Sequence, residues 1–261
     1  MSLVTSLAGK RVIVTGGGRG IGAAMVGVLV EEGAKVASMD VTDDAGRAVV
    51  DAANSNGPGR ASYRHCDVAS RSDVEAAFAA AVAEMGGLDG LVNAAGIERH
   101  VAPEDITDEQ WNEMMSVNVT GTFLTNQVAF RYLHDAGGRI LNFGSDAGLI
   151  NYPNAAHYSA TKGAVMSWTR SVAAAWGRYG ITVNSVVPAI WTPMYDDHRA
   201  IFNPEELAAH DAAMAQVIAI GGKLGDPVRD LAPVLVFLLG AGARFITGQL
   251  ISVNGGANGT R

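Results

Sequence analysis

Short apolar runs alternate with longer helical stretches along almost the whole chain, and this alternation limits the fold more than any other feature. The apolar runs cover residues 11–15, 35–40, 61–66, 90–93, 139–144, 182–187 and 250–253. Stretches with helical periodicity, such as 22–32, 73–84 and 158–179, lie between them. Strands that alternate with helices build a parallel sheet covered on both faces. The pattern therefore predicts an α/β fold: a single Rossmann-type, doubly wound domain over residues 1–261, with seven parallel strands flanked by helices.

The alternation breaks late in the chain, at about residues 191–222. This segment holds Trp191, Pro193, Tyr195, Phe202 and Pro204 among charged residues. Long connections of this kind tend to be functional loops. We therefore expect a partly helical insertion that acts as a substrate lid.

A capping-box spacing marks the start of the helix before the fifth predicted strand. Thr107 and Gln110 are three residues apart, which predicts a long helix from 108 towards His134. Gly137 and Gly138 follow its expected end.

Composition excludes several classes of protein. The 261 residues carry 19 Lys and Arg against 26 Asp and Glu, and this net charge of −7 argues against a nucleic-acid binder. The one cysteine, Cys66, allows neither an intramolecular disulfide nor a cysteine metal cluster. The six histidines show no metal-ligand spacing on a helix. No apolar stretch approaches the roughly 20 residues of a membrane span. We expect a cytoplasmic enzyme without a metal and without membrane or nucleic-acid partners.

A glycine-rich turn follows the first predicted strand and opens the first helix. Residues 15–22 read Thr-Gly-Gly-Gly-Arg-Gly-Ile-Gly, which is T-G-x-x-x-G-x-G rather than the strict G-x-G-x-x-G. Glycines there let a pyrophosphate approach the helix N-terminus, whose free N–H groups attract anions. In a doubly wound sheet this position predicts a dinucleotide site.

Asp40, at the end of the second predicted strand, bears on the choice of dinucleotide. A carboxylate there can accept hydrogen bonds from both hydroxyls of an adenosine ribose, and it repels a 2′-phosphate. Arg19 pulls the other way, because a guanidinium near the ribose can bind that phosphate. Val41 supplies no second cation. NAD is therefore the expected cofactor, and NADP is less favoured.

Tyr158 and Lys162 stand four residues apart in a predicted helix, so their side chains project from one face. A lysine cation near a phenol favours the phenolate and is expected to lower the tyrosine pKa. Such a tyrosine can exchange a proton with an alcohol or a carbonyl oxygen near neutral pH. Ser145 ends an apolar strand shortly before, where its hydroxyl can hold a substrate oxygen.

In this order and spacing, the signals resemble those of the classical short-chain dehydrogenase/reductase family, from the first strand to nearly the last residue. The resemblance is carried by the glycine turn, Cys66-Asp67-Val68, Asn93-Ala94-Ala95-Gly96, Asn118, Ser145, Tyr158 with Lys162, and Pro188 with Thr192. It implies an oxidoreductase that moves a hydride between a nicotinamide cofactor and a secondary alcohol or ketone.

The resemblance also implies a role for each matched position. Tyr158 would be the general acid and base, Ser145 would polarise the substrate oxygen, and Lys162 would bind the nicotinamide ribose and depress the tyrosine pKa. Asn118, the fourth catalytic residue, would kink its helix and hold a water that connects Lys162 to solvent. The expected cofactor contacts are Gly16, Arg19, Gly20, Ile21, Gly22, Asp40, Asp67, Val68, Asn93, Ala94, Gly96, Tyr158, Lys162, Pro188, Ile190 and Thr192.

Three positions depart from the family pattern. Ala189 stands where a glycine is common, Asp146 follows the catalytic serine, and Asn254 replaces an aspartate near the C-terminus. An inward-facing Asp146 could repel acidic substrates, but the side chain is expected to face away from the site or to contact solvent. Asn254 is expected to affect the turn rather than the reaction.

Substrate specificity is expected to come from residues that flank the catalytic set, and these are largely apolar or aromatic. The predicted substrate contacts are Ser145, Ala147, Asn151, Tyr158, Trp191 and Tyr195, with Tyr152, His157, Ile190 and Met194 beside them and residues 98–100 across the cleft. Such a wall suits a hydrophobic secondary alcohol or its ketone, cyclic ones included, such as a steroid, a terpenoid, a cyclohexanol or a dihydrodiol. Asp196, Asp197 and His198 are expected on the solvated surface of the lid.

Other functions are weighed against this one. A 3-oxoacyl-thioester reductase, acting on an acyl carrier protein or on coenzyme A, is similar in overall pattern. The acidic balance and Asp40 count against it, and Arg131, Arg170 and Arg178 form no cluster. An NAD-binding regulator without turnover would be expected to lack the tyrosine or the lysine. The short C-terminal region disfavours a sugar-nucleotide epimerase or dehydratase.

The resemblance further implies a homotetramer, assembled through the two long helices near 108–135 and 157–179 and through the last strand. That strand, 250–253, is apolar and would be prone to aggregate if it were left uncovered.

Overall fold

Seven parallel strands form one sheet at the centre of the protein. The computed structural model describes residues 6–257. The strands are β1 (Arg11–Thr15), β2 (Lys35–Asp40), β3 (Arg60–His65), β4 (Gly90–Asn93), β5 (Gly138–Phe143), β6 (Ile181–Pro188) and β7 (Leu250–Val253). Their order is β3-β2-β1-β4-β5-β6-β7, and every neighbouring pair is parallel. This confirms the predicted seven-stranded, doubly wound sheet.

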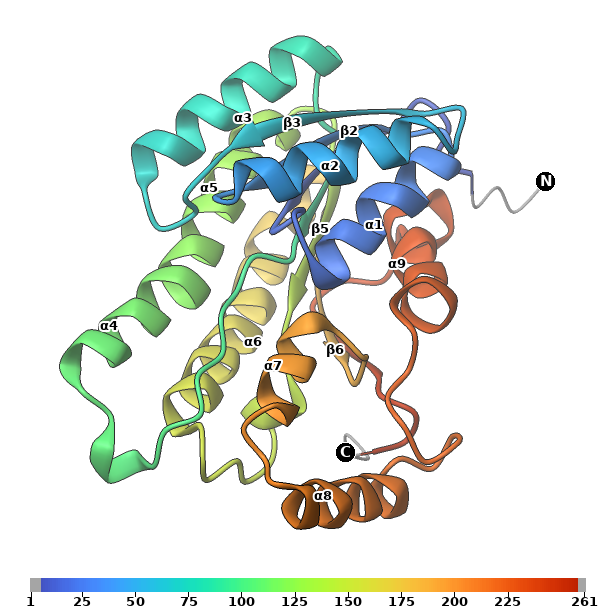
Figure 1. Ribbon diagram of the computed structural model, residues 1–261. Coiled ribbons are helices and arrows are strands. Elements are labelled where there is room, and N and C mark those ends of the chain that lie inside the picture. Colours follow the sequence, from blue (N-terminus) through green and yellow to red (C-terminus); the bar gives the residue numbers. More distant parts are fainter. Residues whose placement is uncertain (1–5, 258–261) are drawn as a thin grey trace.

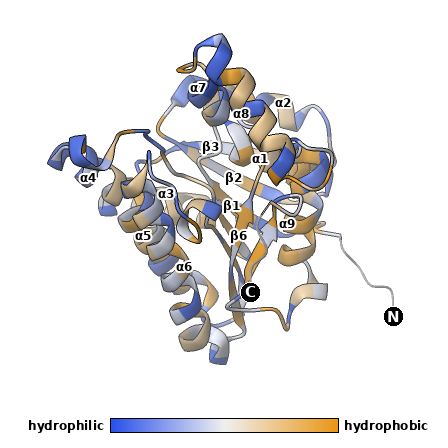
Figure 2. Ribbon diagram, turned by 90° about the horizontal axis from the view of Figure 1, so that it is seen from below, coloured by the Kyte–Doolittle hydropathy of each residue, from blue (hydrophilic) through white to orange (hydrophobic). Residues whose placement is uncertain are grey.

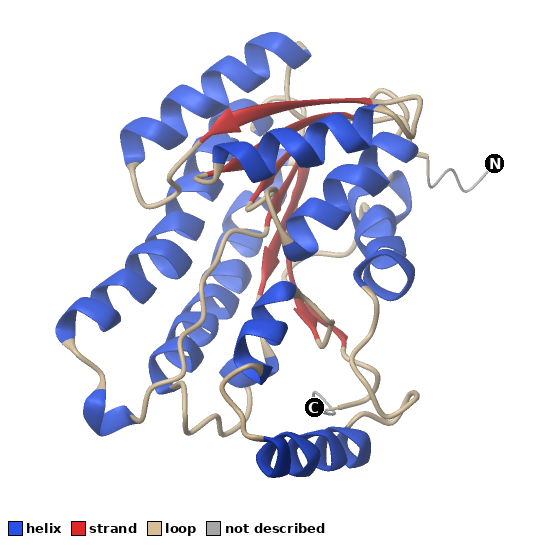
Figure 3. Ribbon diagram, viewed as in Figure 1, coloured by secondary structure: helices blue, strands red, loops and turns tan. Residues whose placement is uncertain are grey.

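Helices cover both faces of the sheet, as the coloured layers in Figure 3 show. They are α1 (Gly20–Glu31), α2 (Asp43–Asn54), α3 (Arg71–Met85), α4 (Asp108–Met115), α5 (Gly121–Leu133), α6 (Ala156–Trp176), α7 (Pro193–Arg199), α8 (Pro204–Val217) and α9 (Ala232–Leu239). In Figure 1, α8 lies at the lower edge of the molecule, beyond α7.

Two hydrophobic cores lie on opposite faces of the sheet. In one, Met25 and Leu29 of α1 pack with Leu235 of α9. In the other, Phe78 of α3 and Leu124 of α5 pack against the far face. Strands covered on both faces are apolar throughout, and every residue from Ile181 to Val187 in β6 is buried. Figure 2 shows the contrast with α4 and α7, which are largely hydrophilic.

The helix after β4 follows its predicted course but contains a local change of winding. Thr107 and Gln110 form the expected capping box at the start of α4. The next five residues, Ser116–Thr120, form a π-helical turn before α5 continues to Leu133. A π turn inserted in an α-helix often marks a functional position. Here the turn is centred on Asn118.

Most strand and helix ends lie within one or two residues of their predicted positions. The third strand begins at Arg60 and the fifth at Gly138, one residue before the predicted starts. Segment 191–222 contains α7 and α8, which agrees with the expected partly helical insertion. Among the described residues, no helix is long and apolar enough to cross a membrane.

Candidate active site and cofactor cleft

The predicted site residues gather at the carboxyl edge of the sheet. The strand order reverses direction between β1 and β4, because β2 and β3 lie on one side of β1 and β4 to β7 on the other. In open α/β sheets, ligands bind in the crevice outside this switch point. The glycine turn after β1 and the loop after β4 therefore border the expected cleft.

The glycine turn is packed so closely that side chains would not fit at two of its positions. A Cβ on Gly22 would lie 2.0 Å from the carbonyl oxygen of Gly16, and a Cβ on Gly16, whose φ is +67°, would lie 2.7 Å from Ala95 Cα. Helix α1 then starts at Gly20 with no side-chain cap on Arg19 and no acidic residue in its first turn. An uncapped helix N-terminus behind a glycine turn has the chemistry that a pyrophosphate requires. The residues present therefore fit a dinucleotide.

Asp40 lies directly beside this turn. Its Oδ2 accepts a hydrogen bond from the Gly18 N–H at 2.9 Å, and its Oδ1 accepts one from Thr42 N–H at 2.9 Å. A Cβ on Gly18 would lie 2.9 Å from the Asp40 carboxyl carbon, so the turn and the end of β2 are in contact. Arg19 points elsewhere: its Nη2 lies 2.9 Å from Asp197 Oδ2 in α7.

The loops after β3 and β4 complete the cofactor side. Asp67 Oδ1 accepts from the Ala69 N–H at 2.9 Å, and Val68 is buried against Gly121. Asn93 is buried at the end of β4, where its Oδ1 accepts hydrogen bonds from Thr15 at 2.8 Å and from Thr125 at 3.1 Å. These bonds tie β1 and α5 to the central strand. Ala94 and Gly96 follow on a partly buried loop.

Ser145, Tyr158 and Lys162 come together as predicted from their spacing. Ser145 follows β5, and its hydroxyl lies near enough to the Tyr158 hydroxyl to favour the ionised form of the tyrosine. Lys162 Nζ lies 5.5 Å from the Tyr158 ring centroid, and it donates a hydrogen bond to the Phe143 carbonyl at 3.0 Å. Both Tyr158 and Lys162 stand in the first two turns of α6, so one helix fixes their relative position.

The expected lowering of the tyrosine pKa is wrong for this structure. Burial raises the Tyr158 pKa above its ordinary value, and the negative charge of Glu98 raises it further, against the opposing effect of the Ser145 hydroxyl. Burial also lowers the pKa of Lys162 to about 8, which Glu98 partly offsets. Spacing alone could not reveal these effects, because they depend on how deeply α6 is covered.

Asn118 stands in the π turn and holds the loop after β4. Its Oδ1 accepts from the Ile97 N–H at 2.8 Å, and its Nδ2 donates to the Ile97 carbonyl at 2.8 Å and to Thr161 Oγ1 at 3.1 Å. Asn118 therefore links this loop to α6, one residue before Lys162. The change of winding at this residue agrees with the kink that was expected.

The remaining cofactor residues lie after β6. Pro188 ends β6, and Ile190 forms an isolated bridge with Gly225. Thr192 caps α7, with its hydroxyl accepting from Tyr195 N–H at 3.4 Å. A Cβ on Gly20 would lie 3.8 Å from Thr192, which brings the start of α7 to the glycine turn.

Comparison with known proteins decides the family. A model of the short chain dehydrogenase family matches residues 10–200. The chain belongs to this family. It is 39% identical to a 2,5-dichloro-2,5-cyclohexadiene-1,4-diol dehydrogenase of Sphingobium indicum, over 97% of this chain and 98% of the relative. It is 36% identical to a 3-oxoacyl-[acyl-carrier-protein] reductase of Vibrio cholerae, over 96% and 98%. Among solved structures, a dehydrogenase/reductase from Sinorhizobium meliloti superposes with a TM-score of 0.86 at 37% identity, covering 98% of this chain and 97% of that one.

The predicted family, fold class and enzyme class are thus confirmed. The protein is a short-chain dehydrogenase/reductase that acts on an alcohol or the corresponding carbonyl, and its family uses a nicotinamide cofactor. The substrate and the choice between NAD and NADP belong to the proposal below.

The predicted substrate residues lie in different surroundings. Ala147 is buried beside Ser145, whereas Asn151 is exposed and its side chain forms no hydrogen bond within residues 6–257. Trp191 is 40% exposed and donates to Asp196 Oδ1 at 2.9 Å, with its ring edge-on to Tyr195 at 5.0 Å.

The cleft wall also contains a polar cluster where a largely apolar wall was expected. Tyr152 donates to Glu98 Oε1 at 3.1 Å, and His100 Nε2 lies 3.3 Å from the same oxygen. The His100 ring lies against the His198 ring of α7, with 3.7 Å between centroids and the two planes tilted by 35°. The expectation that His198 faces solvent is therefore wrong, and burial lowers its pKa to about 4.

Sequence patterns do not predict the positions of two histidines in this neighbourhood, His198 and His210. Tyr195 forms a 2.8 Å hydrogen bond with His210 of α8. The charged neighbours of His198, Asp196 and Asp197, predict a solvated position for it. No local signal marks either histidine, since their partners lie on other elements. Within the described part of the chain, no three His, Cys, Asp or Glu side chains are grouped as a metal site would need.

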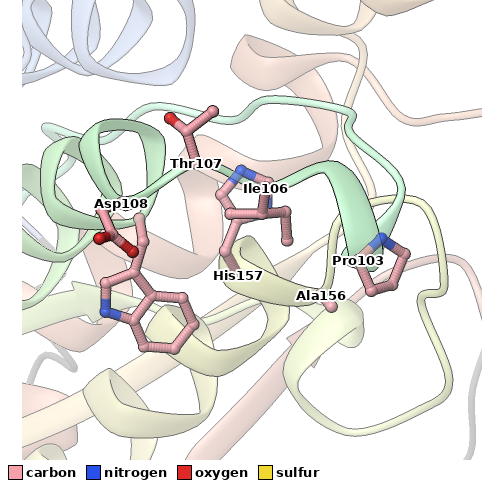
Figure 4. Close-up of a pocket in the computed structure, with 7 residues that line it drawn as sticks. Pro103, Ile106, Thr107, Asp108, Ala156 and His157 are labelled. Atoms are coloured by element: carbon pink, nitrogen blue, oxygen red, sulfur yellow. The ribbon is translucent and has the colours of Figure 1, made fainter.

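A pocket of about 330 Å³ lies between the start of α4 and the start of α6 (Figure 4). Its walls are Pro103, Ile106, Thr107, Asp108, Trp111, Ala156 and His157. His157 is buried, and neither ring nitrogen has a hydrogen-bond partner among the described residues. None of the predicted catalytic or cofactor residues lines this pocket.

Proposed function

We propose that this protein is an NAD-dependent dehydrogenase that interconverts a cyclic, largely hydrophobic secondary alcohol and its ketone. One observation carries the proposal: the Ser145 hydroxyl lies near the Tyr158 hydroxyl and favours its ionised form, with the Lys162 ammonium 5.5 Å from the tyrosine ring, at the carboxyl edge of the sheet. This arrangement can hold a substrate oxygen and exchange one proton with it.

Each side chain has a separate task in the proposed reaction. Ser145 donates a hydrogen bond to the substrate oxygen and orients it towards Tyr158. Tyr158 takes the hydroxyl proton in oxidation and returns it in reduction. When bound, the nicotinamide ring accepts or supplies the hydride. Lys162 stabilises the tyrosinate that must be present before oxidation and that forms in reduction, and Asn118 keeps α6 in register with the loop after β4.

The geometry of Asp40 supports NAD over NADP. Its carboxylate is fixed by two backbone N–H groups beside the glycine turn. Arg19, which would favour NADP, is paired with Asp197. The 2′-phosphate of NADP would be repelled by the fixed carboxylate of Asp40, and Arg19 would not be free to bind it. Like charges in contact cost on the order of 4 kcal/mol at an effective dielectric near 20.

Relatives support a ring-shaped alcohol as the substrate. The Sphingobium indicum relative is named for a cyclohexadiene diol and is similar over nearly its whole length. The aromatic residues Tyr152, Trp191 and Tyr195 can pack against a ring. Segment 191–222 would cover this ring as a lid, with Thr192 and the backbone near Ile190 on the cofactor side.

A 3-oxoacyl-thioester reductase is the second candidate, supported by the 36% identity to the Vibrio cholerae reductase. An acidic carrier protein would need a basic surface at the mouth of the cleft. Arg131 and Arg178 lie near the carboxyl ends of α5 and α6, and these helices run back to the opposite edge of the sheet. Asp40 also disfavours NADPH. The silent regulator has less support still, because Asn118, Ser145, Tyr158 and Lys162 are all present.

A homotetramer stays a prediction, as does a cytoplasmic location. Strand β7 ends the described sheet with all four residues partly exposed, and Trp111 on α4 is 43% exposed. A partner subunit on these surfaces would cover both. Light scattering coupled to size exclusion tests the assembly directly.

The proposed function is tested by incubating the protein with NAD or NADP and a panel of linear and cyclic secondary alcohols, and following the reduced nicotinamide. Tyr158→Phe is expected to lower turnover by about 10²–10⁴-fold. Tyr132→Phe, a change at an exposed tyrosine of α5, serves as the matched control. Turnover with NADP alone, or undiminished turnover in Tyr158→Phe, would contradict the proposal.

A further inference from the structure

A carboxylate lies near the proposed catalytic tyrosine, although a negative charge there does not assist proton transfer. Glu98 stands on the loop after β4 with 15% of its side chain exposed. Its negative charge reaches Tyr158, Tyr152 and Lys162. A negative charge near Tyr158 makes the phenolate harder to form and so opposes Lys162. The use of Glu98 must therefore lie in something other than the proton step.

The position of Glu98 is fixed on both sides. The preceding residue, Ile97, has its N–H and its carbonyl both bound by the Asn118 side chain at 2.8 Å. Further along the loop, Val101 bridges Ala155 and donates to the Asn154 carbonyl at 2.9 Å. A side chain on such a backbone is organised before any ligand arrives, which lowers the cost of binding one.

One carboxylate oxygen of Glu98 remains available to a ligand. Oε1 accepts the Tyr152 hydroxyl at 3.1 Å and lies 3.3 Å from His100 Nε2. Oε2 has no hydrogen-bond partner among residues 6–257. An ionised carboxylate has about four acceptor sites, and a mostly buried one is costly unless they are filled. Glu98 can therefore accept a donor that the substrate brings.

The surrounding rings suit a cyclic substrate. The Tyr152 ring lies 6.4 Å from the Tyr158 ring, and the Tyr152 hydroxyl is hydrogen-bonded to Glu98. Tyr152 therefore links Glu98 to the neighbourhood of the reacting hydroxyl. The His198 ring of α7 lies against the tilted ring of His100, and the Tyr195 ring is stacked with that of His198 at 6.4 Å between centroids. Flat rings offer apolar faces to a saturated ring, while the carboxylate takes a hydroxyl at its edge.

We propose that Glu98 determines specificity by accepting a hydrogen bond from a second hydroxyl of a neutral cyclic diol, while Tyr158 acts on the first hydroxyl. This inference rests on the proposed dehydrogenase function and narrows its substrate class. A monoalcohol has no second hydroxyl to offer to Glu98. An acidic substrate would bring a second negative charge to the same place.

The test compares a diol with its monoalcohol in matched variants. The kcat/KM values for cyclohexanol and for the cis and trans isomers of 1,2-, 1,3- and 1,4-cyclohexanediol are measured with NAD. The variants are Glu98→Leu, Glu98→Gln and Glu104→Gln, the last a control at an exposed glutamate further along the same loop. Melting temperatures of all variants show whether each one folds.

We expect the native protein to favour at least one diol isomer over cyclohexanol by about tenfold or more, as a hydrogen bond to a charged group allows. Glu98→Leu is expected to remove this preference, and Glu98→Gln to reduce it; Glu104→Gln should keep it. If Glu98→Leu does not fold, the diol-to-cyclohexanol ratio of kcat/KM in Glu98→Gln tests the inference instead. An unchanged diol-to-monoalcohol ratio in the folded Glu98 variants overturns the inference.

The outcomes separate this inference from the function on which it rests. Turnover of cyclohexanol without preference for any diol leaves the dehydrogenase in place and overturns the role of Glu98 alone. A native protein that oxidises no alcohol in the panel overturns both.

Discussion

The side-chain amide of Asn254 donates to the carboxylate of Asp146, with its nitrogen 3.2 Å from each carboxylate oxygen. Both residues depart from the family pattern, and they are 108 positions apart in the chain. Asn254 is buried just after β7, and Asp146 begins the turn that follows Ser145. The two departures are therefore in contact, and an aspartate at 254 would face a second carboxylate.

Asn254→Asp is expected to destabilise the protein by about 1–3 kcal/mol at pH 7, because it replaces a hydrogen bond with a like-charge contact. The repulsion raises the pKa of one carboxyl in the folded state, so the loss fades as pH falls towards about 4 and protons bind. Urea unfolding of the native protein and of Asn254→Asp at pH 7 and pH 5 measures this loss of stability. The double variant Asp146→Asn/Asn254→Asp should recover most of the loss; equal losses in the single and double variants would contradict the contact.

Lys162→Met is expected to stabilise the protein while abolishing activity. Burial lowers the Lys162 pKa from 10.5 to about 8, so the folded protein holds this proton less tightly than the unfolded chain does. The charged lysine therefore costs stability in full below pH 8, and this cost disappears as pH rises through 8 towards 10.5. Once the lost hydrogen bond to Phe143 is subtracted, Lys162→Met should raise the free energy of unfolding at pH 7 by about 2 kcal/mol.

Differences in melting temperature between Lys162→Met and the native protein, measured at pH 7 and at pH 10, check this prediction. Lys35→Met, at an exposed lysine of β2, is the control. Its melting-temperature difference from the native protein should be nearly the same at pH 7 and at pH 10. A gain for Lys162→Met that is the same at both pH values would show that the lysine is not buried as a charge.

Asp40→Asn tests the cofactor preference with little change in shape. Asparagine can still accept the Gly18 N–H, but it carries no charge to repel a 2′-phosphate. The ratio of kcat/KM with NAD to that with NADP should fall by about tenfold to a hundredfold. Asp44→Asn, an exposed position in the first turn of α2, should leave the ratio as it is. An unaltered ratio in Asp40→Asn would mean that other residues select the cofactor.

Two glycines of α1 should respond in opposite ways to alanine. A Cβ on Gly22 would lie 2.0 Å from a backbone oxygen, so Gly22→Ala must displace the turn and should abolish NAD binding. A Cβ on Gly27 meets nothing within 4 Å, and Gly27→Ala should add about 0.5–1 kcal/mol of stability through helix propensity. Calorimetric titration with NAD and thermal melting measure both effects. Tight NAD binding by Gly22→Ala would rule out the close packing of the turn.

The sequence by itself determined the features that depend on local pattern. Short apolar runs indicated the strands and a period of 3.6 residues indicated the helices, and the four-residue spacing placed Tyr158 and Lys162 on one helix face. The capping box at Thr107 and Gln110 needed only residues three apart. The glycine turn and Asp40 were found in the same way, because each acts through its own stretch of backbone.

Tertiary structure alone decided what depends on contacts between distant residues. The π turn at Asn118 is accompanied by hydrogen bonds to Ile97, the contact between the His198 and His100 rings joins α7 to the loop after β4, and Asn254 meets Asp146 only once β7 is in the sheet. The Tyr158 pKa likewise depends on burial and on Glu98, both set by how the loops close over α6. A linear pattern records which side chains are present, whereas desolvation and pairing depend on which of them the fold brings together.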